Sequence, residues 1–251
     1  MDDKIEYLLR QGDNALILSQ QLSKLCGKGP SAGRRHGAHQ RRARPAGPDP
    51  HVAHLCLGEL EGRGRDEDQL AYLRDAHQMR NCLLVEQPNG NYADTMVRQF
   101  YFDTWHYFLM QGLTRSSDSR IAEIAEKSIK EVTYHLRRSG DLIVRMGDGT
   151  EDSHAKTQSA VNALWMYSGE AFNYDALDEA MVAQGVAPAA DVLRASFLEH
   201  VAEIFAEATL AMPDAAAWMQ KGGKQGRHSE HLGYILAEMQ FLQRAYPGSE
   251  W

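Results

Sequence analysis

Residues 119–147 read SRIAEIAEKSIKEVTYHLRRSGDLIVRMG, and their apolar side chains recur at helical spacing. A helix of this length carries a long apolar stripe, which only other long helices can cover along its whole length. The run therefore predicts an extended helical bundle. The apolar positions are Ile121, Ala125, Ile129, Val132, Leu136 and Ile143, and Gly147 is a typical helix end.

Other stretches show the same helical periodicity, and none shows the alternation of apolar and polar residues that marks a strand. The turn PNGN precedes one helical pattern, which covers residues 91–113. The remaining helical patterns cover residues 6–26, 156–172, 191–210 and 231–246. We therefore expect an all-α fold, with the whole chain, residues 1–251, forming a single domain.

Residues 31–56, SAGRRHGAHQRRARPAGPDPHVAHLC, do not fit this pattern. They include five arginines, four histidines, three prolines and one acidic residue, in a chain whose formal net charge is -7. The prolines exclude a continuous helix, although a four-helix core needs a long second helix at this place in the chain. We expect the second bundle helix to be disrupted here.

Three explanations of the basic segment remain open. The first is a frameshift. If the DNA that encodes this segment is read one base out of frame, codons compatible with the printed residues can encode ALEEDMALTNVALDLLGQTRMWLTYA, a long amphipathic helix. Normal helical sequence resumes after residue 57. We favour such a frameshift over residues 31–57. The alternatives are a disordered basic insertion and an arm that binds an acidic partner.

Charge and composition argue against several classes of function. A net charge of -7 disfavours nucleic acid as a partner, and no apolar run approaches the roughly 20 residues that cross a bilayer. The start MDDKIEYLLRQGD is acidic, unlike a signal peptide, and the three cysteines lack CxxC spacing. We expect a cytoplasmic protein with reduced cysteines and with no membrane or nucleic-acid partner.

Two predicted helices carry carboxylates and histidines at the spacing of metal ligands. Asp103 and His106 lie three residues apart, and Glu131 has the same spacing to Tyr134. Di-iron carboxylate proteins use a Glu-x-x-His pair from each of two bundle helices and one Glu from each of the others. Here the ligand set is incomplete, since a tyrosine stands at one ligand position and residues 6–26 offer only one aspartate. We expect no metal and no catalytic residue, but a hydrogen-bonded polar layer of Asp13, Asp103, His106, Glu131, Tyr134 and His135.

A second candidate site is the loop QKGGKQGRHSEH, residues 220–231. Glycines separate Lys221, Lys224 and Arg227, which would let backbone amides and cations approach one anion together. We expect these three residues to contact an anion or a partner protein; the alternative is a solvated connection between helices. His228 and His231 share a helix face, but two histidines alone are a weak metal pattern.

Four stretches resemble the C subunit of the bacterial phenylacetyl-CoA epoxidases, a family of multicomponent monooxygenases of phenylacetate degradation. They are LRQGDNALILSQQLSKLCG, LLVEQPNGNYADTMVRQFYFDTWHYFL, KSIKEVTYHLRRSGDLIVRMGDGT and GGKQGRHSEHLGYILAEMQFLQRAYPG. The resemblance covers nearly the whole chain except residues 31 to about 57. There the family has a helix similar to the shifted-frame reading.

The resemblance implies a ferritin-like helical bundle with extra C-terminal helices, and a structural role without catalysis by this chain alone. In this family the C subunit pairs with the homologous, catalytic A subunit, whose di-iron centre epoxidises the aromatic ring of phenylacetyl-CoA. The small B subunit joins the complex, and a separate reductase supplies electrons from NADPH.

By this likeness the polar layer is a vestigial metal site, this chain binds no cofactor, and the glycine-lysine loop lies near the catalytic subunit or the CoA phosphates. The alternative is an autonomous di-iron carboxylate oxygenase that uses Asp13, Asp103, His106, Glu131 and His135 as ligands.

Overall fold

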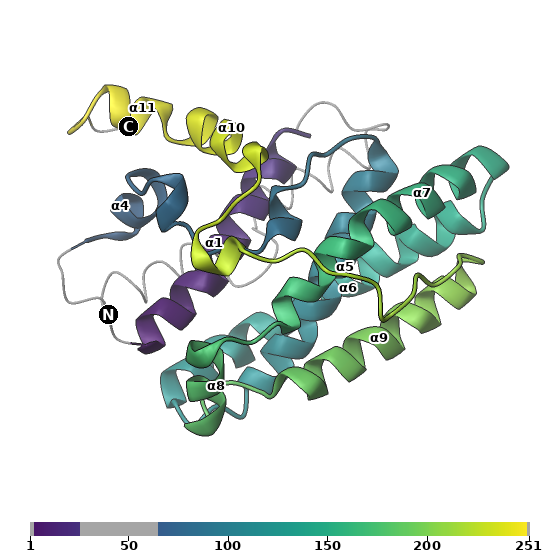
Figure 1. Cartoon of the computed structure of the whole chain (residues 1–251), viewed down its shortest axis with the longest axis horizontal. Coiled ribbons are helices and arrows are strands. Elements are labelled where there is room, and N and C mark those ends of the chain that lie inside the picture. The colour runs from purple at the N-terminus through teal and green to yellow at the C-terminus, as the bar shows by residue number, and fades with distance from the viewer. Residues whose placement is uncertain (1–2, 26–64, 250–251) are drawn as a thin grey trace. The chain divides into compact units, whose positions relative to one another are not determined.

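The computed structural model describes residues 3–25 and 65–249. Every regular element in these two stretches is a helix, and neither stretch contains a strand (Figure 1). The prediction of an all-α fold is therefore confirmed, and the helices are consistent with a ferritin-like bundle that has extra C-terminal helices. The basic segment, residues 31–57, lies outside the described residues, and so does the predicted break in the second bundle helix.

The contacts within the chain group it into two compact units. Of the described residues, the first unit contains 3–25, 65–87 and 222–249, and the second unit contains 88–221. The first unit is thus assembled from separate segments, whereas the second is one continuous stretch. That the whole chain forms a single domain stays a prediction.

Four long helices make up most of the second unit. They are α5 (Tyr92–Leu113), α6 (Ser119–Gly147), α7 (Glu151–Ser168) and α9 (Ala190–Glu207). α5 contacts the other three and is the central helix of this bundle, while α6 also contacts α7 and α9 (Figure 1). The 3₁₀ turn η3 (Gly169–Phe172) and the short helix α8 (Ala176–Ala183) lie between α7 and α9 in the sequence.

Side-chain caps fix where α5, α6 and α7 begin. Asn91 Oδ1 accepts hydrogen bonds from the backbone amides of Ala93 (2.7 Å) and Asp94 (3.2 Å), and the Asp94 carboxylate accepts one from the Asn91 amide (2.8 Å). Asp118 and Thr150 cap α6 and α7 with their side-chain oxygens. Each such cap stabilises a helix by about 1 kcal/mol, so the boundaries are encoded locally.

Aromatic side chains dominate the core of the second unit. Phe100 and Tyr101 of α5 are fully buried, and their ring centroids lie 6.0 and 6.2 Å from that of Phe205 on α9. Trp165 of α7 packs edge-on against Tyr101 at 5.6 Å, and Phe197 of α9 lies 6.2 Å from Tyr101. Burying a phenylalanine side chain contributes roughly 1.5–3 kcal/mol, so this cluster is a large part of what holds the bundle together.

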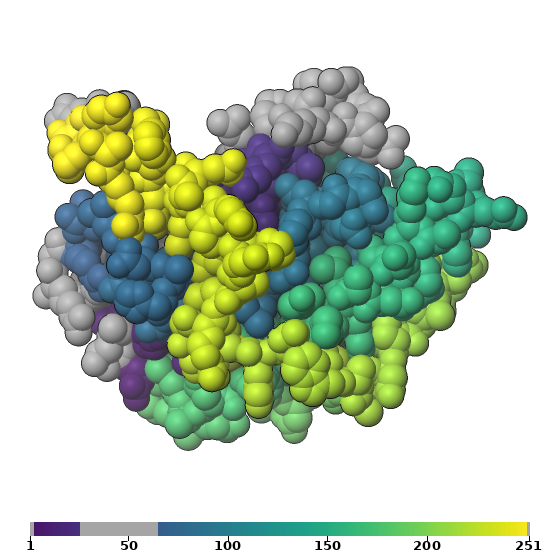
Figure 2. Space-filling model, turned by 45° about the horizontal axis from the view of Figure 1, so that its top comes forward, coloured from purple at the N-terminus to yellow at the C-terminus, as the bar shows by residue number. Residues whose placement is uncertain are grey.

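The first unit combines short helices from distant parts of the sequence. It contains α1 (Asp3–Ser23), α4 (Glu67–Tyr72), η1 (Ala76–Gln78), η2 (Leu83–Glu86), η4 (Gly223–Gln225), α10 (Glu230–Met239) and α11 (Phe241–Ala245). α10 contacts α1, η1 and η2, and Figure 2 shows the C-terminal segment lying against residues 65–87. None of the described helices combines the length and the apolarity that a membrane span requires.

The helical pattern over residues 231–246 forms two helices instead of one. Gln240 separates α10 from α11, and its buried side chain donates to the carbonyl oxygens of Ala71 (3.2 Å) and Arg74 (2.9 Å). Arg244 of α11 also donates to the Arg74 carbonyl oxygen, at 3.0 Å. These bonds join the C-terminal helices to α4 and to the segment that follows it.

Candidate functional site

One buried face of α5 carries Gln99, Asp103 and His106, spaced by four and three residues. Gln99 Nε2 donates a hydrogen bond of 2.5 Å to Asp103 Oδ1. A buried carboxylate costs several kcal/mol unless hydrogen bonds compensate it. The amide of Gln99 supplies one such bond, and it is a partner that the ligand spacing alone did not indicate.

His106 lies one turn beyond Asp103 and is 5% exposed. Burial lowers the pKa of its imidazole from 6.5 to about 3, so the ring is neutral at neutral pH. The ring packs against Phe102, with ring centroids 5.2 Å apart, and against Trp105 at 6.1 Å. A neutral imidazole cannot form an ion pair, so His106 lies among these aromatic rings without a charge of its own.

α6 supplies the other predicted members of the layer within the second unit, but not all from its buried side. His135 is buried, and the hydroxyl of Ser139, one turn further on, donates to the His135 carbonyl oxygen at 3.0 Å. Glu131 is half-buried. Tyr134 is 52% exposed, and its hydroxyl accepts a hydrogen bond from Arg138 Nη1 at 3.4 Å. The structure therefore places Tyr134 on the outer face of α6 and His135 in the interior.

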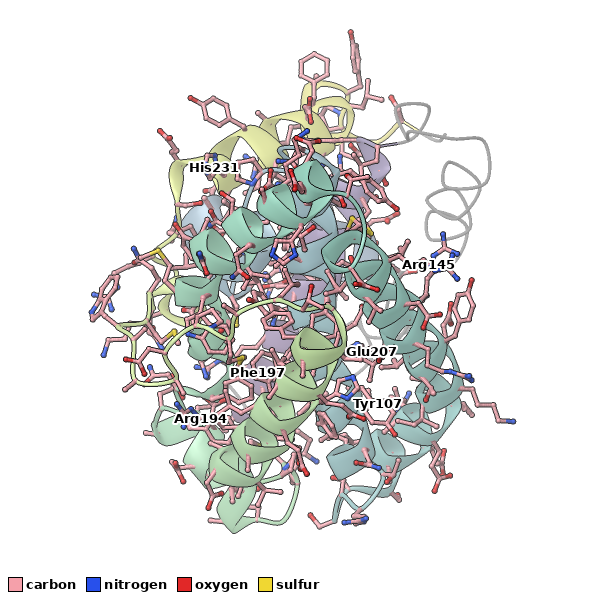
Figure 3. All side chains as sticks on the ribbon, turned by 90° about the vertical axis from the view of Figure 1, so that its right-hand side faces the viewer. Tyr107, Arg145, Arg194, Phe197, Glu207 and His231 are labelled. Atoms are coloured by element: carbon pink, nitrogen blue, oxygen red, sulfur yellow. The ribbon has the colours of Figure 1, made fainter. Side chains whose placement is uncertain are left out.

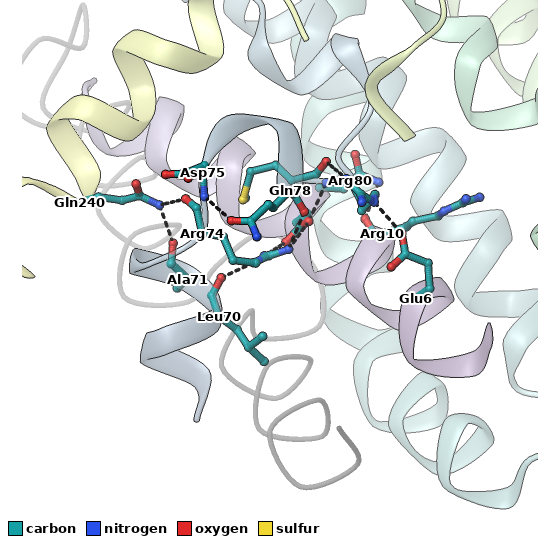
Figure 4. Close-up of polar contacts among 12 residues, drawn as sticks. Glu6, Arg10, Leu70, Ala71, Arg74, Asp75, Gln78, Arg80 and Gln240 are labelled. Atoms are coloured by element: carbon teal, nitrogen blue, oxygen red, sulfur yellow. Dashed lines mark hydrogen bonds and ion pairs between the residues drawn. The ribbon is translucent and has the colours of Figure 1, made fainter. Parts of the chain in front are cut away.

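Asp13 belongs to the first unit, where it forms a buried ion pair with Arg74. Figure 4 shows Arg74 with Leu70 and Gln78. Both of its carboxylate oxygens accept hydrogen bonds from the guanidinium of Arg74, with Nη1 at 3.0 Å from Oδ2. Oδ2 also accepts the backbone N–H of Arg80, at 2.7 Å. Arg74 is held in turn by the carbonyl oxygens of Leu70 (2.6 Å from Nε) and Gln78 (3.3 Å from Nη1).

These partners make a poor fit to a di-iron centre. The carboxylate of Asp13 already neutralises a buried guanidinium, and Asp103 accepts from an amide on its own helix. Within residues 3–25 and 65–249, no group of three or more His, Cys, Asp or Glu side chains is arranged to hold a metal ion. That these residues form a vestigial, hydrogen-bonded layer stays a prediction.

The three cations of the glycine-lysine loop differ in exposure. Lys221 and Arg227 are exposed, whereas Lys224 is 6% exposed. A buried ammonium is not available to a ligand in solution. Only Lys221 and Arg227 therefore present their side chains to solvent. A contact of Lys221, Lys224 and Arg227 with an anion or a partner protein stays a prediction.

The glycines of this loop allow two backbones to lie very close together. A Cβ atom on Gly223 would lie 2.2 Å from the carbonyl oxygen of Asn81, and one on Gly226 would lie 2.3 Å from that of His77. Gly226 also has a φ of 76°, which L side chains rarely adopt. Packing against residues 77–82 therefore explains these two glycines without any ligand.

Glu86, the last residue of η2, is fully buried and accepts four hydrogen bonds. Asn81 Nδ2 donates at 2.9 Å, His228 Nδ1 at 2.5 Å, and Ser229 through its amide (2.8 Å) and its hydroxyl (2.6 Å). His228 Nε2 lies 3.0 Å from the carbonyl oxygen of Met79. Both ring nitrogens of His228 therefore lie within hydrogen-bond distance of oxygen atoms, those of the Glu86 carboxylate and of the Met79 carbonyl. This buried network joins η2 to the start of α10.

Sequence reasoning missed this second network. Glu86 was part of an apolar run, LLVEQP, and a carboxylate inside such a run is the one feature that would have indicated a buried, paired charge. His228 was considered only with His231, as a weak metal pattern. Its partner Glu86 lies 142 residues away in the sequence, so no local spacing could reveal it.

Two comparisons with known proteins agree with this description. The sequence profile of the family described as "Phenylacetic acid catabolic protein" matches residues 1–251. Among characterised proteins, the chain is similar to the C subunit of the 1,2-phenylacetyl-CoA epoxidase of Escherichia coli (strain K12). The two are 44% identical over an alignment of 267 positions, which covers 100% of each chain.

Proposed function

The chain belongs to the phenylacetic acid catabolic protein family, and we propose that it is the structural C subunit of a phenylacetyl-CoA epoxidase. The observation that carries the proposal is the full-length identity of 44% to a protein of that name. An identity of this size over both whole chains favours the same place in the same complex. The family resemblance expected from the sequence is thus confirmed.

The site described above supports a scaffold in preference to a catalyst. Asp13 is committed to Arg74, and Asp103 to Gln99. His106 is neutral and buried among aromatic rings. A protein that activates oxygen needs an open set of metal ligands, and Asp13, Asp103 and His106 do not supply one.

In the proposed complex the chemistry lies outside this chain. Iron belongs to the catalytic subunit, which binds phenylacetyl-CoA, while a second, small subunit joins the complex and a reductase component delivers electrons from NADPH. This chain supplies a rigid helical surface that stabilises the catalytic subunit. The assembly works in the cytoplasm, where CoA esters are made and consumed.

The test is to express the chain by itself and together with the catalytic subunit, and to measure iron content and co-purification. A scaffold purifies by itself without bound iron and forms a stable complex with the catalytic subunit. About two irons per chain in the protein expressed by itself would instead establish the autonomous di-iron oxygenase.

A variant sharpens this choice. Asp103→Asn keeps the size of the side chain and removes the charge that a metal ligand needs. If the chain is a scaffold, the complex that contains Asp103→Asn keeps its epoxidation rate as long as the variant is folded and bound to the catalytic subunit. Loss of both iron and activity in a folded, assembled variant would overturn the proposal.

A further inference from the structure

The last two helices carry large apolar side chains on their exposed side. Tyr234 of α10 is 68% exposed, and Phe241, Leu242 and Tyr246, in and just after α11, are 62%, 46% and 56% exposed. In Figure 3, where the label His231 marks α10, aromatic rings extend outward from the C-terminal helices at the top of the view. The exposed apolar residues of this segment form what we call the C-terminal apolar face: Tyr234, Ala237, Phe241, Leu242, Ala245 and Tyr246.

Helical spacing makes the C-terminal apolar face continuous. Tyr234, Ala237 and Phe241 follow one another at intervals of three and four residues, which place side chains on one side of a helix. Gln240, between the two helices, keeps a right-handed helical backbone, so the spacing runs on from α10 into α11. The outer side of a surface helix is usually polar, whereas α10 is apolar on its exposed side as well as on its buried side. Its buried residues are Leu232, Ile235, Leu236 and Met239.

Two of the charges beside this face are paired within the chain. Lys24 Nζ lies 2.7 Å from Glu238 Oε2, and Arg244 Nη2 lies 2.9 Å from Asp75 Oδ1. Glu230 is exposed too, but it lies in the first turn of α10, at the end of the face, where the helix dipole favours a negative charge. A two-fold axis brings identical residues of two copies together, so a face with uncompensated charge at its centre would repel itself. The pairing of Glu238 removes that obstacle here.

The size of the face decides which partner it suits. At these exposures the side chains of Tyr234, Phe241, Leu242 and Tyr246 present roughly 400 Å² to solvent, because an aromatic side chain covers about 150–250 Å². An obligate interface with a different subunit buries about 2,000 Å² or more, of which one partner supplies about half, and this face is too small for that share. A two-fold axis uses the face twice and, with the residues around it, buries roughly 1,000 Å², which is enough for a specific but weak pair.

We propose that the C-terminal apolar face binds the same face of a second copy of this chain, about a two-fold axis. Ala237 lies at the centre of the face, and its small side chain lets two helices approach closely at the axis. In an antiparallel pair centred there, Tyr234 of each copy packs against Phe241 of the other, so one aromatic contact forms twice. The proposal stands apart from the proposed function. A chain that also pairs with a catalytic subunit would join two such pairs through this face.

The test measures self-association of the full chain by itself, by sedimentation equilibrium across micromolar to submillimolar concentrations. The variant Tyr234→Glu/Phe241→Glu replaces both rings with like charges that would face one another across the axis. Its control, Val192→Glu/Trp218→Glu, makes the same change in net charge at apolar side chains of the second unit that are 60% and 68% exposed. Thermal unfolding checks that both variants are folded.

We expect the wild type and the control to form the same two-chain species, with dissociation constants within about twofold of each other, and the first variant to weaken it at least about tenfold. Added sodium chloride should not dissociate the pair, because salt screens exposed charges and not apolar contacts. A wild-type chain that stays monomeric throughout this range would overturn the inference, and so would a folded first variant that associates as tightly as the wild type. The measurement needs no other subunit, so failure to assemble with a catalytic subunit bears on the proposed function alone.

Discussion

The ion pair between Asp13 and Arg74 shows how single residues of this chain handle buried charge. The two residues are 61 positions apart, and their side chains are 0% and 5% exposed. Two charges in the interior are tolerated only when each compensates the other and the remaining polar atoms are hydrogen-bonded. The backbone N–H of Arg80 and the carbonyl oxygen of Leu70 complete that arrangement.

Asp13→Asn should therefore lower the free energy of unfolding by about 3–5 kcal/mol, because it leaves the Arg74 guanidinium buried without a counter-charge. The control is Glu6→Gln, which breaks the partly exposed pair with Arg80 (2.6 Å) and should cost less than about 1 kcal/mol. Urea unfolding measures both. Equal losses in the two variants would contradict the assigned role of Asp13.

The pKa of His106 predicts how stability depends on acidity. Burial lowers this pKa from 6.5 to about 3, so below pH 6.5 the unfolded chain binds a proton that the folded chain does not. The contribution of His106 to the free energy of unfolding is therefore complete above pH 6.5, the pKa in the unfolded chain. It is lost as the pH falls from there toward the folded pKa of about 3, at up to about 1.4 kcal/mol per pH unit. In His106→Gln the slope of unfolding free energy between about pH 4 and pH 6 should be smaller by that amount. An unchanged slope would show that His106 does not make this contribution.

At the residue scale the sequence predicts neighbours on one helix and little else. The spacing of Asp103 and His106 placed both on one buried face of α5, as found. The predicted polar layer included both Tyr134 and His135, although adjacent helical residues point about 100° apart and only His135 is buried. The pairing of Arg74 with Asp13 and of Glu86 with His228 could not be found from spacing, because the paired residues lie 61 and 142 positions apart.

Among the elements, the glycine-lysine loop has the tightest steric requirement. Gly223→Ala would place a Cβ atom 2.2 Å from the carbonyl oxygen of Asn81, and a backbone atom cannot yield as a flexible side chain would. We expect the variant to lose about 1–3 kcal/mol of stability, as overpacked sites do. Thermal or urea unfolding measures the loss.

Gly233 provides the matched control for that experiment. It lies inside α10, and a Cβ atom there would meet nothing within 4 Å. Gly233→Ala should stabilise the protein by roughly 0.5–1 kcal/mol, since alanine loses less conformational entropy in a helix than glycine. A Gly223→Ala variant as stable as Gly233→Ala would refute the close packing of the loop against residues 77–82.

Periodicity predicted the long helices of the second unit well, and α5, α6 and α7 also begin at side-chain caps, whereas α9 begins without one. It predicted the elements of the first unit poorly. Residues 76–78 and 83–86 form 3₁₀ turns too short to show a period, and Gln240 divides a continuous helical pattern through bonds to a distant segment. Elements that depend on partners elsewhere in the chain leave little trace in their own sequence.

For the whole molecule, the division into two units predicts the effect of a truncation. Ending the chain after Lys221 removes the partners that Glu86 has in His228 and Ser229. Amide hydrogen exchange should then show lost protection in residues 3–25 and 65–87, with protection retained across the helices of residues 88–221. Ending the chain after Tyr246 is the control and should leave both units protected. Uniform loss of protection after the first truncation would contradict the division.

The segmented first unit has a consequence for synthesis on the ribosome. Domains generally fold in the order in which their chains emerge. Residues 88–221 contain their whole unit once translated, but residues 3–25 and 65–87 must wait for residues 222–249. Until then the carboxylate of Glu86 lacks its hydrogen-bond partners His228 and Ser229. The first unit can therefore fold only after the C-terminal helices have been synthesised. A nascent chain that stalls earlier keeps this unit unfolded, and chaperones and proteases can recognise it.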